Sequence, residues 1–378
     1  MRIGILTLPL HTNYGGIVQA YALQTVLQRM GHDVSVINRP TPKKPAAIRV
    51  LIYYLRRLFR HYILGNKAVS TRWNEGAIKE YKTTKSIYDF INYKIHNRFI
   101  TDLTSLKPTE FDAIVVGSDQ IWRKAYFTDI EDAFLKFAEK WDVLRVAYSA
   151  SFGKDNIDDY TAEEKANIRR LLSKFDKVSV RESSGVTICK DEFGVEAEQM
   201  LDPTILLNAS DYNTLIESYG AAEFKGNFYN YILDQREEIS ETIKAIEQQN
   251  GWTSYRVNDI VSTGKHSSTK IQPQSVERWL QAIRDAEAII TDSFHGCVFS
   301  IIFNKPFIVF GNQGRGMSRF ESLLKMTGLT DRLVSSKAEA VSKSVLLTQK
   351  PNALSIIETK KREAKEYLTI LQNKFDRR

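Results

Sequence analysis

The chain has 378 residues, 43% of them hydrophobic and 26% charged, with a formal net charge of +8. This length favours two domains, and the composition excludes a disordered, collagen-like or coiled-coil chain. No apolar stretch approaches the ~18 residues that span a bilayer, and the two cysteines are too few for a disulfide framework or a zinc site. Because only a short apolar run follows Arg2, we expect no signal peptide and a cytoplasmic protein.

The first forty residues predict a βαβ unit. Residues 2–8 form an apolar run bounded by a turn, which indicates a buried strand. Residues 16–30 have helical periodicity that stops at Gly31, and residues 33–38 form a second strand-like run. A strand, a helix and a strand in so short a segment favour a parallel sheet.

The positive charge is concentrated in residues 41–100. This basic segment holds thirteen Lys or Arg residues against three acidic ones, so the rest of the chain is slightly acidic. Helices are predicted at 46–64 and 72–95. In the first helix, apolar side chains share one face and arginines another, which suits either an anionic membrane surface or ordinary packing on the sheet. No nucleic-acid-binding motif accompanies the segment, so we expect no nucleic-acid partner.

Strands and helices alternate along the rest of the chain. Leu201-Asp202-Pro203 is typical of a domain boundary, because proline cannot continue a strand ladder. Before this boundary we predict strands at 113–116, 144–148 and 177–180, and helices at 161–175 and 182–192. After it we predict strands at 228–233, 253–257, 288–291 and 306–310, and helices at 236–249, 275–285, 294–303 and 352–375.

These elements predict an α/β fold with two Rossmann-like domains that face a cleft. Residues 1–203 would form the first domain, on the acceptor side, and residues 204–345 the second, on the donor side. Residues 346–378 would form a C-terminal helix that packs back on the first domain. Ligands of open α/β sheets bind beyond the carboxyl ends of the strands. Residues that leave those ends are therefore the candidates for a site.

Strand ends of the first domain carry groups suited to a sugar. The loop after the first strand opens a helix whose free N–H groups favour an anion, although a plain tight turn is the alternative. After residue 116, a carboxylate, an amide and an indole suit sugar hydroxyls and a ring face; the alternative is a turn at Asp119 with the indole in the core. We assign six residues to acceptor binding: Asn13, Tyr14, Gly15, Gln120, Trp122 and Ser151.

Strand ends also supply a histidine and three arginines. His295 lies where a predicted strand enters a helix and suits proton transfer near neutral pH, unless it merely caps or packs. Arg315 and Arg319 lie on a glycine-containing loop, and Arg181 directly follows a strand. Guanidinium groups suit bidentate capture of phosphate or carboxylate, with solvated arginines as the alternative. The absence of GxSxG, HExxH and Walker motifs argues against a hydrolase triad and a metal site.

Five motifs together resemble the polysaccharide pyruvyl transferase family. They are Asn13-Tyr14-Gly15-Gly16, Gly117-Ser-Asp119-Gln-Ile-Trp122, Tyr148-Ser-Ala-Ser-Phe-Gly153, Val178-Ser-Val-Arg181-Glu182 and Thr291-Asp-Ser-Phe-His295-Gly296. The resemblance covers about residues 1–330 and is weakest in the basic segment. It implies a two-domain fold like that of the GT-B glycosyltransferases. It also implies transfer of the pyruvyl group of phosphoenolpyruvate onto two sugar hydroxyls, which forms a pyruvate ketal and releases phosphate.

The resemblance implies a donor site with one departure from the family. The catalytic histidine of the family matches His295, and its phosphoenolpyruvate-binding arginine matches Arg181. Members carry Arg-Leu-His where this chain has Ser293-Phe-His295, so an arginine is missing. Arg315 and Arg319 are our candidates to replace it, and Ser293 and Gly296 complete the predicted donor site.

The resemblance and the residues together give a reaction hypothesis. Protonated His295 would give its proton to the methylene carbon of phosphoenolpyruvate while arginines hold the phosphate and carboxylate. Asp119 would bind or deprotonate the acceptor hydroxyl. The acceptor would be a sugar of a bacterial surface polysaccharide, or its lipid-linked precursor at the inner face of the cytoplasmic membrane. Phosphoenolpyruvate is the donor substrate, so no cofactor is expected.

Two other functions remain open from the sequence. One is a GT-B-type glycosyltransferase that uses a nucleotide sugar, for which we see no carboxylate pair suited to a ribose. The other is a nucleic-acid-binding protein that uses the basic segment.

Overall fold

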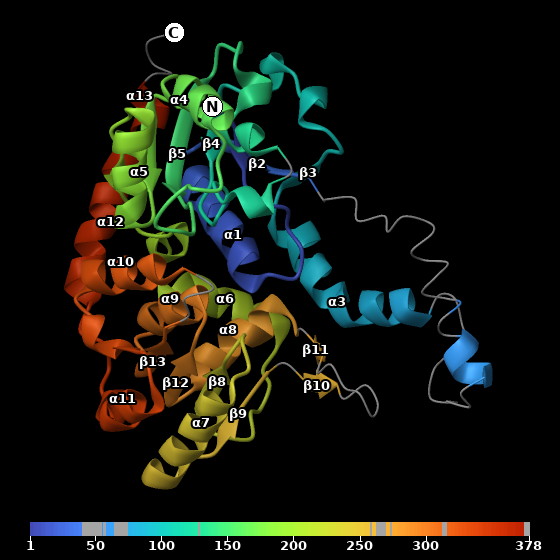
Figure 1. The fold of residues 1–378 in the computed structure, drawn as a ribbon, viewed down its shortest axis with the longest axis vertical. Coiled ribbons are helices and arrows are strands. Elements are labelled where there is room, and N and C mark those ends of the chain that lie inside the picture. Colours follow the sequence, from blue (N-terminus) through green and yellow to red (C-terminus); the bar gives the residue numbers. More distant parts are fainter. Residues whose placement is uncertain are drawn as a thin grey trace.

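Two parallel β-sheets organise the chain, and Figure 1 shows them one above the other. The computed structural model describes residues 1–39, 55, 58–63, 75–127, 129–257, 259–261, 270–272, 274–311 and 316–373. Most of the predicted helix at 46–64 lies outside these described residues, and so does Arg315. The membrane contact and the role of Arg315 therefore stay predictions.

The first sheet has seven parallel strands in the order β3-β2-β1-β4-β5-β6-β7. β1 lies between β2 and β4, and Ile5 pairs with Val36 on one side and Val115 on the other. Its central strands are continuous apolar runs, as expected for a parallel sheet with both faces covered. The strands are β1 (Arg2–Leu6), β2 (Asp33–Asn38), β3 (Asn97–Phe99), β4 (Ala113–Val116), β5 (Leu144–Ala150), β6 (Lys177–Val180) and β7 (Glu198–Gln199).

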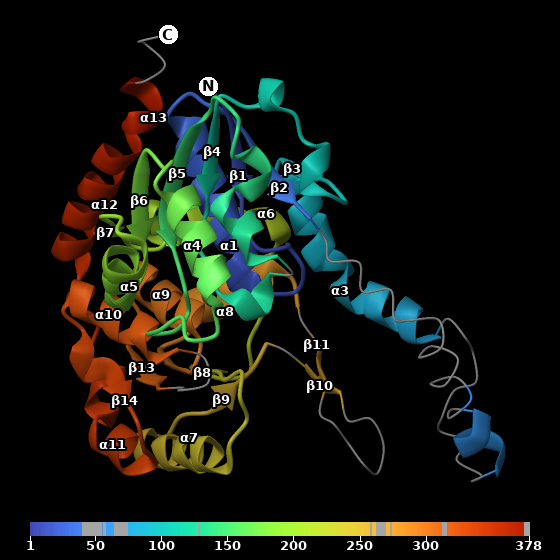
Figure 2. The same ribbon diagram turned by 45° about the horizontal axis from the view of Figure 1, so that its top comes forward.

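The second sheet has five parallel strands in the order β14-β13-β12-β8-β9. A separate antiparallel pair, β10 (Asp259–Val261) and β11 (Lys270–Gln272), projects from this half in Figure 2. The strands that we did not predict are mostly edge strands of two or three residues, which are too short to show a periodicity. The five strands are β8 (Phe228–Tyr231), β9 (Ser254–Tyr255), β12 (Ala288–Thr291), β13 (Phe307–Phe310) and β14 (Leu333–Val334).

Most helices lie where the sequence predicts them, but those at Ala209–Tyr219, Met317–Thr327 and Lys337–Ser342 were not predicted. The second of these three holds Arg319, which we expected on a loop. No helix among the described residues is long and apolar enough to cross a membrane. The helices of the first half are α1 (Tyr14–Arg29), α3 (Glu75–Lys94), α4 (Ala162–Leu172) and α5 (Ser183–Phe193). They are followed by α6 (Ala209–Tyr219), α7 (Glu237–Asn250), α8 (Val276–Asp285), α9 (Phe294–Ile302), α10 (Met317–Thr327), α11 (Lys337–Ser342), α12 (Leu354–Leu368) and α13 (Ile370–Asn373).

The C-terminal helix α12 returns to the first sheet, which confirms the prediction. Figures 1 and 2 both show α12 running along the β5–β7 side of that sheet. The hydroxyl of Tyr367 donates a hydrogen bond of 2.8 Å to the carbonyl of Ala147. The ammonium of Lys177 lies 4.5 Å from the centre of the same ring. The helix thus links the second half of the chain to strands of the first.

The two halves also contact each other at the carboxyl ends of their strands. Tyr14, in the first turn of α1, stacks on Trp279 of α8 with ring centres 5.2 Å apart, and its hydroxyl donates to the carbonyl of Gln274. Farther along, the backbone N–H of Ser183 donates to the hydroxyl of Ser322. The loops that carry the predicted site residues therefore face each other across this contact.

Candidate active site

His295 lies where the two halves meet. It is the second residue of α9, the helix that follows β12. Ser293 caps the start of this helix, because its hydroxyl accepts a hydrogen bond from the N–H of Gly296. The imidazole is buried, with 7% of the residue exposed. A Cβ atom on Gly15, in the first turn of α1, would overlap the imidazole at Nδ1. Gly15 therefore lets the first domain touch the histidine of the second.

This contact makes Gly15 a sensitive position. We expect Gly15→Ala to lower kcat/KM about 100-fold, because a displacement of the imidazole by about 1 Å is enough for such a loss. The melting temperature should also fall, because the buried imidazole must move and this overlap outweighs the higher helix propensity of alanine. Gly4→Ala is the matched control, since its Cβ would crowd the buried Phe111 ring at 2.8 Å and would not touch the histidine. Equal activity of the two variants would contradict the role of Gly15.

A buried carboxylate that we did not predict lies beside His295. Asp202 follows β7 and is fully buried, with its Oδ2 atom 3.5 Å from Nε2 of His295. The same oxygen accepts hydrogen bonds from Arg181 Nη1 at 2.9 Å and from the Ser118 hydroxyl at 3.0 Å. Its Oδ1 atom accepts from the N–H and the hydroxyl of Thr204. Asp202 thus joins β4, β6 and α9 in one network.

The network keeps Asp202 ionised. Burial by itself raises the pKa of this carboxyl, but the contacts with His295, Arg181 and Thr204 outweigh burial and hold the pKa below its usual range. An ionised carboxylate attracts a protonated imidazole and orients its ring. Asp202 is therefore placed to orient the imidazole of His295.

Arg181 and Arg319 converge on Phe294. The guanidinium carbon of Arg181 lies 4.4 Å from the centre of the Phe294 ring, and that of Arg319 lies 5.6 Å from it. Within the described residues, Nε and Nη2 of Arg181 are buried without a hydrogen-bond partner. Burial and the charge of Arg181 lower the pKa of Arg319 to about 10, so Arg319 stays charged at neutral pH. Buried donors without partners favour an anionic ligand at this point.

This arrangement accounts in part for the serine at position 293, where family members carry arginine. The hydroxyl of Ser293 serves as the cap of α9, and Arg319 reaches the neighbouring ring from α10. Arg319 thus reaches Phe294, which stands where family members carry leucine, one residue after the missing arginine.

Asp119 is brought to the same cluster. It follows β4 and adopts a left-handed backbone conformation with φ of 75°, which non-glycine residues seldom adopt and which often marks a functional position. Its Oδ1 atom lies 3.7 Å from Nη2 of Arg181. Asp119 and Asp202 therefore lie at different nitrogen atoms of the same guanidinium.

Three of the predicted acceptor residues are used for packing, which corrects those assignments. Trp122 is fully buried: its ring stacks on Phe134 and its N–H donates to the carbonyl of Ala133. The buried hydroxyl of Ser151 donates to the carboxylate of Glu182. The ring of Tyr14 stacks on Trp279 of the other domain. The strand-end loop turns its indole inward because burying so large a ring is strongly favourable.

The other acceptor assignments remain predictions, and the structure places their residues at the domain contact. Asn13 is exposed just before α1, and Gly15 lies against His295. The side-chain oxygen of Gln120 accepts from Arg123 and lies against Gly153.

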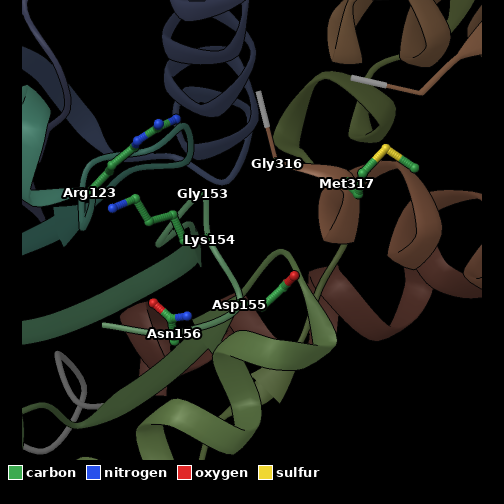
Figure 3. A pocket seen from close by; sticks show the side chains of 7 residues that line it. All are labelled: Arg123, Gly153, Lys154, Asp155, Asn156, Gly316 and Met317. Carbon is green, nitrogen blue, oxygen red and sulfur yellow. The ribbon is translucent and has the colours of Figure 1, made fainter. Parts of the chain in front are cut away.

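A pocket of about 490 Å³ opens between the halves next to the cluster. It is bordered by Arg123, by the loop after β5 and by the start of α10, as Figure 3 shows. His295 and Arg181 are buried and do not line it. Among the described residues, no group of three or more His, Cys, Asp or Glu side chains is arranged to hold a metal ion.

The comparison with protein families decides the assignment. Residues 13–314 match the sequence model of the family described as polysaccharide pyruvyl transferase. The chain belongs to the polysaccharide pyruvyl transferase family. It is therefore a transferase. No curated protein sequence matches this pyruvyl transferase family member significantly.

Solved structures show which fold this pyruvyl transferase has. The UDP-GlcNAc 2-epimerase of Methanocaldococcus jannaschii matches with a TM-score of 0.52 and 15% identity over 99% of this chain and 100% of that chain. A putative UDP-N-acetylglucosamine 2-epimerase of Listeria monocytogenes matches with a TM-score of 0.53 and 10% identity, over 100% and 97% of the two chains. The Neisseria meningitidis UDP-GlcNAc 2-epimerase gives 0.53 and 11%, over 98% and 100%. At these identities the likeness establishes the GT-B-type fold alone.

Proposed function

We propose that this transferase moves the pyruvyl group of phosphoenolpyruvate onto two hydroxyls of a sugar, forming a pyruvate ketal and releasing phosphate. The observation that carries the proposal is the buried cluster of a histidine, an ionised carboxylate and two arginines at the domain contact. Proton donation and capture of two anionic groups are what this donor demands. The acceptor would be a sugar of a surface polysaccharide or of its lipid-linked precursor.

The reaction has two steps, an addition and then a displacement. In the first, His295 gives a proton to the methylene carbon of the donor, which becomes a methyl group, and an acceptor hydroxyl bonds to the adjacent carbon. In the second, the carbon–oxygen bond to phosphate breaks and the second hydroxyl takes its place. Of the two hydroxyl protons, one returns to the histidine and the other leaves with phosphate.

The other residues hold the reacting groups. Arg181 directs unpartnered N–H groups into the cluster, which suits the donor phosphate or carboxylate. Arg319 adds a second positive charge beside the same ring. These charges stabilise the leaving phosphate and fix the donor before reaction. Asp119 lies 3.7 Å from Arg181, which would hold the donor. From there its carboxylate would bind the attacking hydroxyl of the acceptor or take its proton.

A donor comparison tests the proposal. The purified chain, given a mixture of bacterial surface-sugar acceptors, should release inorganic phosphate from phosphoenolpyruvate and yield a product with a ketal methyl signal in its NMR spectrum. Phosphoenolpyruvate without an acceptor is the control and should release at least about 100-fold less phosphate, because the attacking hydroxyl is missing. Consumption of a nucleotide sugar instead, with no phosphate release, would favour the glycosyltransferase alternative.

A further inference from the structure

The pocket beside the active site is built from both halves of the chain. Arg123 precedes a short 3₁₀ turn after β4, and residues 153–156 form the loop that follows β5. Gly316 and Met317 begin α10 on the opposite side, as Figure 3 shows. A ligand in this pocket would therefore touch both domains.

Two glycines form the wall between the pocket and the buried cluster. A Cβ atom on Gly316 would lie 2.5 Å from the carbonyl oxygen of Gly153 and 3.4 Å from Nε of Arg319. Both glycines have positive φ values, 68° at Gly153 and 85° at Gly316, so the close approach needs glycine at each position. Arg319 in turn borders Phe294, the neighbour of His295. The pocket therefore lies next to Arg319 and, through Phe294, beside the cluster around His295.

Arg123 is the fixed cation of this pocket. Its Nη1 atom donates to the neutral side-chain oxygen of Gln120 at 2.7 Å, and its guanidinium carbon lies 4.9 Å from the centre of the Tyr126 ring. Within the described residues, its Nε atom is buried without a hydrogen-bond partner and no carboxylate forms an ion pair with it. A guanidinium held by an amide and a ring, but not neutralised, suits an oxyanion.

The remaining lining suits a sugar. Lys154 adds a second positive charge, shared with Asp159 at 2.8 Å. Asp155 and Asn156 offer a carboxylate and an amide for hydroxyl groups, and Met317 offers an apolar side chain for a ring face. A volume of about 490 Å³ lies within the range of small-molecule sites.

We propose that this pocket binds the acceptor and that Arg123 selects sugars that carry an oxyanion, either a carboxylate or a phosphate. The proposal deepens the proposed function, on which it rests for the identity of the bound sugar as the acceptor. Arg123 is a binding residue here, separate from the arginines assigned to the donor.

Equilibrium binding without phosphoenolpyruvate tests this pocket. The probes are galactose, galacturonate and galactose 1-phosphate, titrated into the full chain by calorimetry at one ionic strength. At least one anionic probe should bind ten-fold more tightly than galactose, and the better of the two identifies the oxyanion as carboxylate or phosphate. Arg123→Gln should remove this preference, whereas Arg123→Lys, which keeps the charge but loses the planar fork, should retain part of it.

Lys190→Gln is the matched control, because Lys190 is an exposed cation on α5 outside the pocket. It should bind all three probes as the wild type does, and the melting temperature of each variant checks its folding. Equal affinities for neutral and anionic probes, or an Arg123→Gln variant that binds like the wild type, would overturn the proposal. Because the donor is absent, these results are independent of phosphate release: intact probe binding with no turnover of phosphoenolpyruvate would reject the donor and leave the pocket standing.

Discussion

His295→Gln should lower kcat for phosphate release from phosphoenolpyruvate by about 1,000-fold. Glutamine keeps the size and hydrogen-bonding capacity of the side chain but cannot transfer a proton, and general acid catalysis contributes roughly 10²–10⁴-fold. The arginines that hold the donor are unchanged, so the Kd of phosphoenolpyruvate should stay within about five-fold. Stopped-time phosphate assays and calorimetry with the donor alone measure the two quantities.

His96→Gln is the matched control for this variant. His96 lies on the first domain, beside Gln28 at 3.1 Å and away from the cluster, and its replacement should leave kcat near that of the wild type. A His295→Gln enzyme with more than a tenth of wild-type turnover would remove the acid role from the mechanism. Loss of donor binding together with turnover would point to a binding role instead.

Asp202→Asn should lower kcat about 100-fold and move the alkaline limb of the pH–rate profile to lower pH. The amide oxygen of asparagine can still accept from Thr204, but an NH2 group in place of Oδ2 cannot accept from Ser118 or Arg181. The variant also removes the negative charge 3.5 Å from Nε2 of His295. A protonated imidazole then loses its anionic neighbour. The shift of the pH profile separates a positioning role from a general loss of structure, which would lower kcat equally at every pH.

The same variant should change the acid dependence of stability. The pKa of Asp202 is held below that of an unfolded aspartate, so the ionised group adds stability above about pH 4, and this stability is lost as the pH falls through the folded-state pKa. Asp202→Asn should therefore unfold at lower urea concentration than the wild type at pH 7, and the difference should shrink in acid.

Asp292→Asn is the matched control for Asp202→Asn. Asp292 is equally buried and accepts hydrogen bonds from the backbone of Leu233 and Asp234. Its loss should lower stability while leaving the alkaline limb of the pH profile in place. A similar shift in both variants would mean that Asp202 has no specific effect on His295.

The strand ends explain why part of the site could be predicted. His295, Arg181 and Asp119 each follow a strong apolar run, and such runs identify buried parallel strands without any tertiary information. Because parallel strands direct their carboxyl ends to one edge, residues that leave those ends gather there. The structure brings these three residues into one cluster.

Asp202 was missed for a local reason. Its sequence, Leu201-Asp202-Pro203, is that of a chain leaving a strand, and we interpreted it as a domain boundary. It does cap a 3₁₀ turn, through the N–H of Thr204, as a boundary residue would. Its second carboxylate oxygen contacts residues 21 and 93 positions away along the chain, Arg181 and His295, and no local pattern carries that information.

Trp122 shows the opposite error. An indole beside a carboxylate and an amide at a strand end suits a sugar, but the same residues suit a turn that closes over the core. The positive φ of Asp119 and the stack of Trp122 on Phe134 decide for the core. Sequence alone does not distinguish these outcomes, because both place an aromatic ring three residues after the same aspartate.

The sequence by itself determined the α/β class, the strands at the centre of both sheets and the family, because each depends on hydrophobic periodicity or on motifs within short segments. Only the tertiary structure decided which side chains meet. Gly15 touches His295, and Asp202 joins His295 to Arg181. Arg319 reaches Phe294 from the next helix. These contacts form because loops that follow the strands of the two sheets pack against each other. Such contacts depend on the packing of whole domains, and packing is a property that no local stretch of sequence encodes.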